Sequence, residues 1–204
     1  LFFLGGIVLA VVGGVWAELP WWGVLGFALF AAVAALVHEL IVGLAAMHAG
    51  WFPAFAVTLI FLILGLLLQL PAIPLALLVG YCASTGPAFA DMGYDFKAGW
   101  ILRRERRPYT AFELDSRREQ LKASILGFVV AIGIVALVWP SLFDDGRLPP
   151  TSLVYAETIQ AGLTDPATLV NLVIWAIPGA LVQLVGGPRR QLGVLLATGL
   201  LVAT

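Results

Sequence analysis

Long apolar segments follow one another along almost the whole chain, and they constrain its fold more than any other feature. Segments of about 17 to 25 apolar residues are typical of helices that cross a membrane. Apolar segments of about this length, some of them shorter or longer, occupy 1–17, 21–48, 54–70, 74–89, 123–142, 167–187 and 191–204. We therefore expect an all-α, polytopic transmembrane helical bundle with about six or seven spans.

The composition supports this expectation. Hydrophobic residues make up 61% of the 204 residues and charged residues only 11%, whereas a soluble domain is about half apolar and a quarter charged. We expect one transmembrane domain over 1–204, in a bacterial inner (plasma) membrane. Both ends of the sequence lie inside apolar segments, so we expect it to be part of a longer chain. The single cysteine, Cys82, excludes an intrachain disulfide and is expected to be a buried, inert thiol.

The region 71–95 is ambiguous. Pro71 and Pro74 separate two apolar segments that can be either two short spans or a hairpin that turns within the protein. Farther on, Ser84-Thr85-Gly86-Pro87 predicts a break or kink, because proline removes a helical hydrogen bond. The sequence therefore allows a re-entrant or broken helix around 71–95.

Basic residues are concentrated in one segment. The predicted loop 97–122 contains eight basic and four acidic residues, a net charge of +4. Clustered Lys and Arg in a short loop are typical of the cytoplasmic side of a membrane. If the spans are counted forward from this loop, 144–147 lies on the outer side of the membrane and 188–190 on the cytoplasmic side. This count requires that 151–163 does not cross the membrane.

Two acidic residues stand where an apolar segment meets this basic region, in Asp91-Met-Gly-Tyr-Asp-Phe-Lys-Ala-Gly99. Asp91 and Asp95 are four residues apart and therefore share one face of a helix. They could form a coupled acid pair suited to proton exchange, with Lys97 and Gly99 completing a substrate or proton site. Alternatively, Lys97 neutralises Asp95 in an ordinary ion pair.

The same segment carries a family resemblance. Asp95-Phe-Lys-Ala-Gly99 resembles the Asp-x-Lys-Thr-Gly signature of the oligopeptide transporter (OPT) family, which includes the yellow-stripe-like metal-chelate transporters. The polar-to-apolar segment 116–127 and the proline-led segment 148–162 are similar to that family in order and spacing. The resemblance covers about 30–204 and implies proton-coupled uptake (symport) of small peptides or metal chelates. The chain departs from the family pattern at Ala98, which stands in place of the threonine, and at the 50–54 turn.

Glu39 lies inside the long apolar segment 21–48, next to His38. An ionised acid at that depth costs about 3 kcal/mol on insertion scales, so its side chain should face a cavity or a partner, or be protonated. We expect His38 and Glu39 to bind substrate or protons; a neutral Glu39 bonded to a neighbouring helix is the alternative. Tyr155 and Glu157 could line an extracellular opening or simply lie at the membrane interface.

Other function classes lack support in the sequence. The pattern His-Glu-x-x-His would need a histidine at 42, where the chain has Val42. With one Cys and two His, we expect no resident metal, no other cofactor and no catalytic residues. Neither an enzyme nor a nucleic-acid-binding protein is predicted.

We expect a membrane transporter whose partners are the lipid bilayer, protons, a small peptide or metal chelate, and further copies of the chain or other membrane subunits. A non-transporting scaffold or accessory subunit of a larger membrane complex is the alternative.

Overall fold

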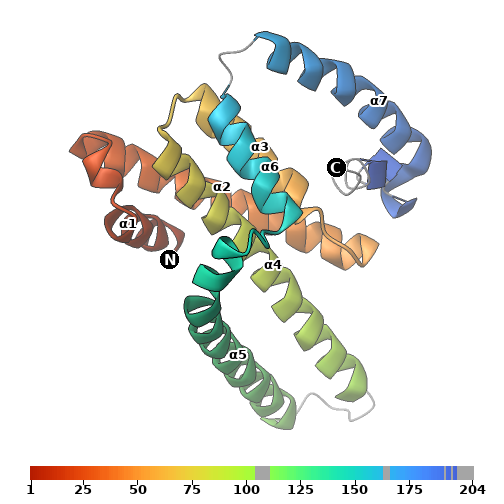
Figure 1. The fold of residues 1–204 in the computed structure, drawn as a ribbon. Coiled ribbons are helices and arrows are strands. Elements are labelled where there is room, and N and C mark those ends of the chain that lie inside the picture. The colour runs from red at the N-terminus through yellow and green to blue at the C-terminus, as the bar shows by residue number, and fades with distance from the viewer. Residues whose placement is uncertain (104–110, 163–165, 191, 194, 197–204) are drawn as a thin grey trace. The chain divides into compact units, whose positions relative to one another are not determined.

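The computed structural model describes residues 1–103, 111–162, 166–190, 192–193 and 195–196 (Figure 1). Across these residues it contains helices and no strands, which confirms the all-α prediction. The α-helices are α1 (Phe2–Val12), α2 (Trp21–Ala49), α3 (Ala54–Leu67), α4 (Ala72–Arg103), α5 (Ala111–Asp144), α6 (Pro150–Ala161) and α7 (Pro166–Arg190), with a short 3₁₀ helix η1 (Val15–Ala17).

Three of the described helices, α2, α4 and α5, are long and apolar enough to cross a membrane, with mean hydropathies of 2.2, 1.4 and 2.5. Shorter apolar helices occur at Phe2–Val12, Ala54–Leu67 and Ile174–Gly187. The most apolar stretch of α5 has no buried side chain at all. An apolar helix exposed on every side is unfavourable in water and favourable in lipid, so these helices indicate a membrane protein.

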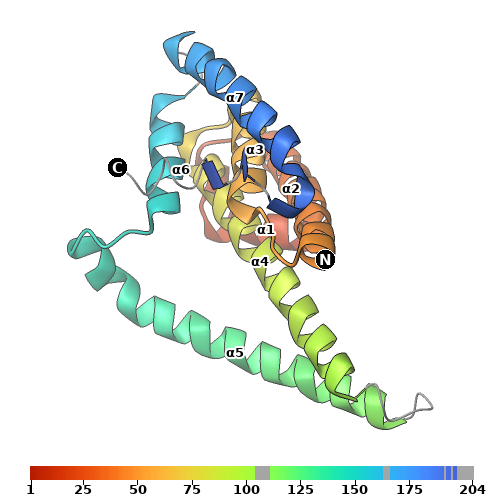
Figure 2. The ribbon, with the colours of Figure 1, turned by 90° about the vertical axis from the view of Figure 1, so that its right-hand side faces the viewer.

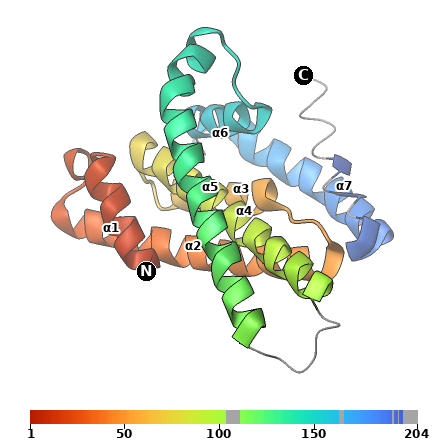
Figure 3. The ribbon, with the colours of Figure 1, turned by 90° about the horizontal axis from the view of Figure 1, so that it is seen from below.

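The described chain forms two compact units: residues 1–87 with 149–204, called here the first unit, and residues 88–148, the second unit. In the first unit α1 packs along α2 (Figure 3). A core of small and large apolar side chains joins these helices to α3 and the first half of α4: Ala10, Val15, Phe27, Ala31, Ala34, Val57, Phe61, Leu78 and Cys82. The Cys82 thiol is free and buried there, as the sequence predicted.

The helix α4 corrects one expectation. It runs as one helix from Ala72 to Arg103, so of the break or kink expected at 84–87 the break does not occur. Pro87 is inside the helix, and the hydroxyl groups of Ser84 and Thr85 donate hydrogen bonds to the Tyr81 carbonyl oxygen, at 3.1 and 2.9 Å. The chain reverses instead at 68–71, between α3 and α4.

The second unit is a helical hairpin, made of the last half of α4 and of α5. The predicted loop 97–122 is mostly helical: 97–103 complete α4 and 111–122 begin α5, which Figure 2 shows as one long helix. Ion pairs three or four residues apart explain why charged residues continue the helix, since they stabilise it: Glu113 with Arg117, Asp115 with Arg118, and Glu119 with Lys122. At 1.5 Å per residue α5 is about 51 Å long, more than the roughly 30 Å of hydrocarbon.

The turn between α3 and α4 yields a first prediction. Gln69 has φ +57°, the left-handed conformation, and the amide of Leu70 donates to the Gly65 carbonyl oxygen at 3.1 Å. A side chain costs about 1 kcal/mol in this conformation, so Gln69→Gly is expected to raise the free energy of unfolding by about that amount. Thermal unfolding in detergent measures it. Gln69→Ala keeps a side chain in the left-handed conformation, so it should not stabilise the protein. Equal effects of Gln69→Gly and Gln69→Ala would contradict the proposed cost of that conformation.

Candidate functional site

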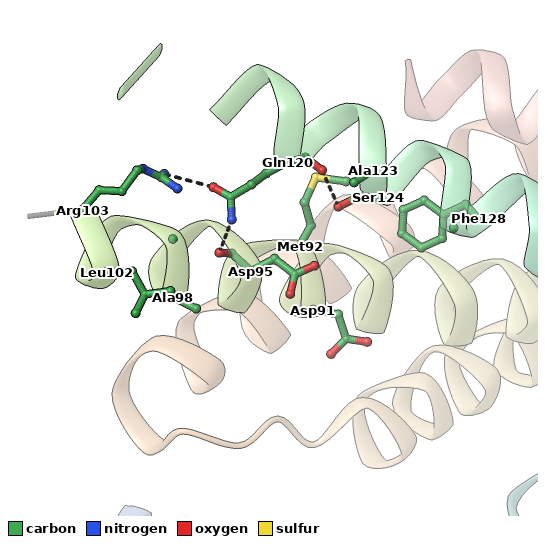
Figure 4. Close-up of a pocket in the computed structure, with 12 residues that line it drawn as sticks. Asp91, Met92, Asp95, Ala98, Leu102, Arg103, Gln120, Ala123, Ser124 and Phe128 are labelled. Carbon is green, nitrogen blue, oxygen red and sulfur yellow. Dashed lines mark hydrogen bonds between the residues drawn. The ribbon is translucent and has the colours of Figure 1, made fainter. Parts of the chain in front are cut away.

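An open groove lies within the second unit, between the last turns of α4 and the first half of α5 (Figure 4). Its volume is about 720 Å³, within the roughly 300–1,000 Å³ typical of small-molecule sites. The lining residues are Asp91, Met92, Asp95, Ala98, Gly99, Leu102, Arg103, Gln120, Ala123, Ser124, Gly127 and Phe128. The groove thus combines apolar side chains with two carboxylates, a guanidinium, an amide and a hydroxyl.

The two carboxylates of the groove have no counter-ion among the residues that the structure describes. Asp91 and Asp95 are exposed, one helical turn apart, and neither carboxylate takes part in an ion pair or a side-chain hydrogen bond within the described ranges. Lys97 points elsewhere: its Nζ lies 4.9 Å from the centre of the Trp100 ring, a cation–π contact. The alternative in which Lys97 neutralises Asp95 is therefore not what this structure shows.

A polar cluster closes the loop end of the groove. Arg103 of α4 donates two hydrogen bonds to the Glu113 carboxylate of α5, from Nε at 2.8 Å and from Nη2 at 3.2 Å. Arg103 also donates to Gln120 Oε1 at 3.1 Å, and Gln120 Nε2 donates to the Asp95 carbonyl oxygen at 2.7 Å, so Gln120 reaches across to α4 (Figure 4). These bonds fix the two helices against each other beside Asp95.

Gly99 leaves room for Gln120 in this arrangement. It is buried, and a Cβ atom there would meet the Gln120 amide and come within 2.7 Å of the Arg103 guanidinium, so the ends of these two flexible side chains would have to shift. Gly99 thus lines the groove beside Gln120. Sequence reasoning missed Gln120 and Glu113, because their partners Asp95 and Arg103 lie 25 and 10 residues away.

The Glu113 carboxylate gives a pH prediction. Glu113 precedes the apolar segment of α5 by ten residues, and its hydrogen bonds from Arg103, helped by those from Arg117, hold its pKa below the ordinary value of 4.5. A lowered folded-state pKa adds stability above the unfolded value, and that stability is lost as the pH falls through the folded value. The melting temperature in detergent should therefore fall as the pH drops below about 4.5, and it should fall less steeply in the Glu113→Gln protein. Melting temperatures that fall equally in both proteins would contradict this role of Glu113.

The first unit holds a second polar cluster, around His38. The imidazole is fully buried, and its Nε2 lies 2.9 Å from Thr58 Oγ1 and 3.1 Å from the Ala54 carbonyl oxygen. Because a carbonyl oxygen only accepts, Nε2 carries the proton and donates it. Nδ1 has no hydrogen-bond partner among the described residues and faces the α-carbon of Gly86, where a Cβ atom would overlap the ring. His38 is thus locked between α2, α3 and α4.

The neighbouring site candidates lie in different surroundings. Glu39 is half-exposed, on a different side of α2 from the buried His38. Tyr155 of α6 is buried against α3: its ring centre lies 5.3 Å from that of Phe55, and its hydroxyl donates to the Phe55 carbonyl oxygen at 3.3 Å. Glu157 is exposed. Of the predicted residues in the second unit, the groove gathers Asp91, Asp95 and Gly99 and leaves out Lys97.

The chain matches no protein-family model, no curated protein and no solved structure. The resemblance to the OPT family therefore rests on the motifs of the sequence alone.

Proposed function

We propose that the protein is a membrane transporter that takes up small peptides or metal chelates together with protons. The observation that supports this most is the pair of carboxylates, Asp91 and Asp95, in an open groove near the end of a helix long enough to cross a membrane; neither has an ion-pair partner among the residues that the structure describes. The OPT-like motif supports the substrate class and includes Asp95 itself.

The groove suits a ligand that carries a positive group on a partly apolar body. The ammonium group of a peptide can pair with Asp91 or Asp95, and Met92, Leu102 and Phe128 offer apolar contact. Charge-assisted hydrogen bonds of this kind are stronger than those between neutral groups. A metal chelate with a net positive charge meets the same requirement.

The acid pair also offers a way to couple transport to protons. Two carboxylates one turn apart supply two acidic sites on one face of the helix. One of them can carry a proton while the other pairs with a cationic group of the substrate. Carrying proton and substrate together in this way is what a symporter requires.

We further propose that the protein lies in the plasma membrane with 97–122 on the cytoplasmic side. Eight basic residues in this segment support that orientation by the positive-inside rule. The groove would then open near the cytoplasmic face.

A non-transporting scaffold is the second candidate, and α5 is the observation that favours it. The absence of buried side chains in its apolar stretch leaves a long face for other membrane subunits as well as for lipid. Such a role predicts fixed stoichiometry with unrelated chains after purification in mild detergent, measured by native mass spectrometry.

Uptake into proteoliposomes tests the transporter directly. The purified full chain is reconstituted, an inward proton gradient is imposed, and accumulation of labelled trialanine, trilysine and a cationic metal chelate is followed. The proposal expects accumulation of at least one of them that a protonophore abolishes. Accumulation no greater than in protein-free vesicles, together with a stoichiometric complex of unrelated subunits, would overturn the transporter proposal in favour of the scaffold role.

A further inference from the structure

We infer that the groove of the second unit binds amphipathic organic cations. The ammonium group of such a ligand lies at Asp91 and Asp95, and its hydrocarbon chain points along the apolar stretch of α5. Transport of this ligand class rests on the proposed function, but its binding in the groove can be measured without any transport.

A hydrogen bond sets the register of the two helices that form the groove. They are the arms of a hairpin and run antiparallel, and Gln120 Nε2 of α5 donates to the Asp95 carbonyl oxygen of α4 at 2.7 Å. Residues after Gln120 therefore lie beside residues before Asp95. Ser124 is about level with Asp91, and Phe128 lies about 6 Å farther from the loop end. Figures 1 and 2 show the two helices closest at the loop end and diverging away from it.

The groove is polar in its middle and apolar at the end away from the loop. Asp91 and Asp95 are exposed in the middle, and neither carboxylate has an ion-pair partner among the residues that the structure describes. At the far end Gly127 and Phe128 line the groove, and they belong to the stretch 125–139, in which every residue is exposed. An apolar helix surface of this kind is favourable in lipid, so the groove is continuous with a lipid-facing surface.

The order of these groups along the groove selects an amphipathic cation. A cationic headgroup pairs with the two carboxylates through charge-assisted hydrogen bonds, which are stronger than those between neutral groups. A hydrocarbon chain that extends from it, away from the loop end, contacts Phe128 and then the exposed stretch of α5. The same carboxylates disfavour an anion, and a small hydrophilic cation gains only the first of the two interactions.

A thiol at the apolar end of the groove reports occupancy. Gly127 lines the groove, and a Cβ atom there would meet nothing within 4 Å, so the Gly127→Cys protein is expected to fold. It is labelled in a maltoside detergent with N-ethylmaleimide, an uncharged thiol reagent, at increasing concentrations of decylammonium. The unaltered protein, whose Cys82 is buried, gives the background rate.

Decylammonium is expected to slow the labelling of Gly127→Cys in a saturable manner. Decanol and decyl sulfate have the same chain length but no positive charge, so they should not protect the thiol. Butylammonium keeps the charge and lacks most of the chain; because each methylene removed weakens binding by about fourfold at most, it should give little protection at the same concentration.

The carboxylates are tested on the same background. Replacing Asp91 and Asp95 together by asparagine should raise the decylammonium concentration for half-protection by about tenfold to a hundredfold, because a hydrogen bond to a charged group is lost. Asp115→Asn is the matched control: Asp115 is exposed and pairs with Arg118 outside the groove lining, so its half-protection concentration should not change. Partition of the ligand into detergent is the same for all these proteins.

A second thiol tests the direction of the chain. Ala98 is exposed, lines the groove and lies on the loop side of Asp95, about 4.5 Å away along the helix axis. Saturating decylammonium should therefore protect Gly127→Cys more than Ala98→Cys. If Gly127→Cys does not fold, Ala123→Cys takes its place, one turn nearer the loop end and also in the lining.

Four outcomes would overturn the inference. Equal protection by decanol would show an apolar site without charge recognition, and equal protection by decyl sulfate would show that basic groups govern the groove. Half-protection that is unchanged by the double asparagine variant would exclude the carboxylates. Stronger protection of Ala98→Cys than of Gly127→Cys would show that the chain points toward the loop end.

The transport assay separates this inference from the proposed function. If decylammonium protects the thiol as expected while proteoliposomes accumulate no substrate, the binding site stands and the transporter proposal fails. If the unaltered protein accumulates trilysine but decylammonium gives no protection, the transporter proposal stands and this ligand class is excluded.

Discussion

Replacing Asp91 or Asp95 by asparagine is expected to weaken uptake of a cationic substrate by about tenfold to a hundredfold, and replacing both should abolish proton-coupled uptake. Asparagine keeps the shape of the side chain and removes the charge that the ammonium group needs. A hydrogen bond to a charged group is worth about 1.5–3 kcal/mol, which corresponds to that range in affinity. Initial rates of trilysine uptake into proteoliposomes, measured across substrate concentrations, give the effect.

The control for these variants is Asp115→Asn. Asp115 is exposed and pairs with Arg118 on α5, outside the groove lining, so uptake should be unchanged. Each protein must also elute as a single species of the same size. Full uptake by the Asp91→Asn, Asp95→Asn double variant would remove both carboxylates from the mechanism.

Gly86→Ala is expected to destabilise the protein by about 3 kcal/mol. The added methyl group would overlap the imidazole of His38, which is held at Nε2 by Thr58 and Ala54 and cannot move without breaking those hydrogen bonds. Overpacking a tight core costs about 1–3 kcal/mol, and each lost hydrogen bond adds about 1 kcal/mol. Thermal or denaturant unfolding in detergent measures the loss.

The same helix provides a matched control. A Cβ atom at Gly80 would meet nothing within 4 Å, and alanine is the better helix former by about 1 kcal/mol, so Gly80→Ala should be neutral or slightly stabilising. His38→Ala combined with Gly86→Ala should recover part of the lost stability, because the two side chains no longer collide. If Gly86→Ala lowered the stability no more than Gly80→Ala, this result would contradict the tight packing around His38.

Much of the helical arrangement could be predicted from hydropathy, and the exceptions have physical reasons. The expected segment 21–48 corresponds to α2, Trp21–Ala49, because a long apolar segment has few alternatives to a helix in a membrane. The segment 84–87 was expected to break or kink a helix; α4 continues through Pro87 without a break, and the hydroxyl groups of Ser84 and Thr85 bond to Tyr81. Charge was taken as the mark of a loop at 97–122, where 97–103 instead complete α4 and local ion pairs support the first turns of α5.

The candidate site was predictable only where it depends on local spacing. Four-residue spacing placed Asp91 and Asp95 on one face of a helix, and both line the groove. The position of Lys97 over Trp100 depends on rotamers that spacing does not determine. Thr58, which bonds His38 from 20 residues away, and Gln120, which bonds Asp95, depend on tertiary packing and leave no signal in a single sequence.

The most direct test of the transporter proposal is the internal pH of proteoliposomes after substrate is added with no gradient imposed. A pH-sensitive dye trapped inside reports protons that enter with the substrate. The account predicts internal acidification on addition of trilysine or a cationic metal chelate to vesicles with the unaltered protein, and none with the Asp91→Asn, Asp95→Asn double variant. Substrate entry without a pH change, or identical acidification by both proteins, would contradict it.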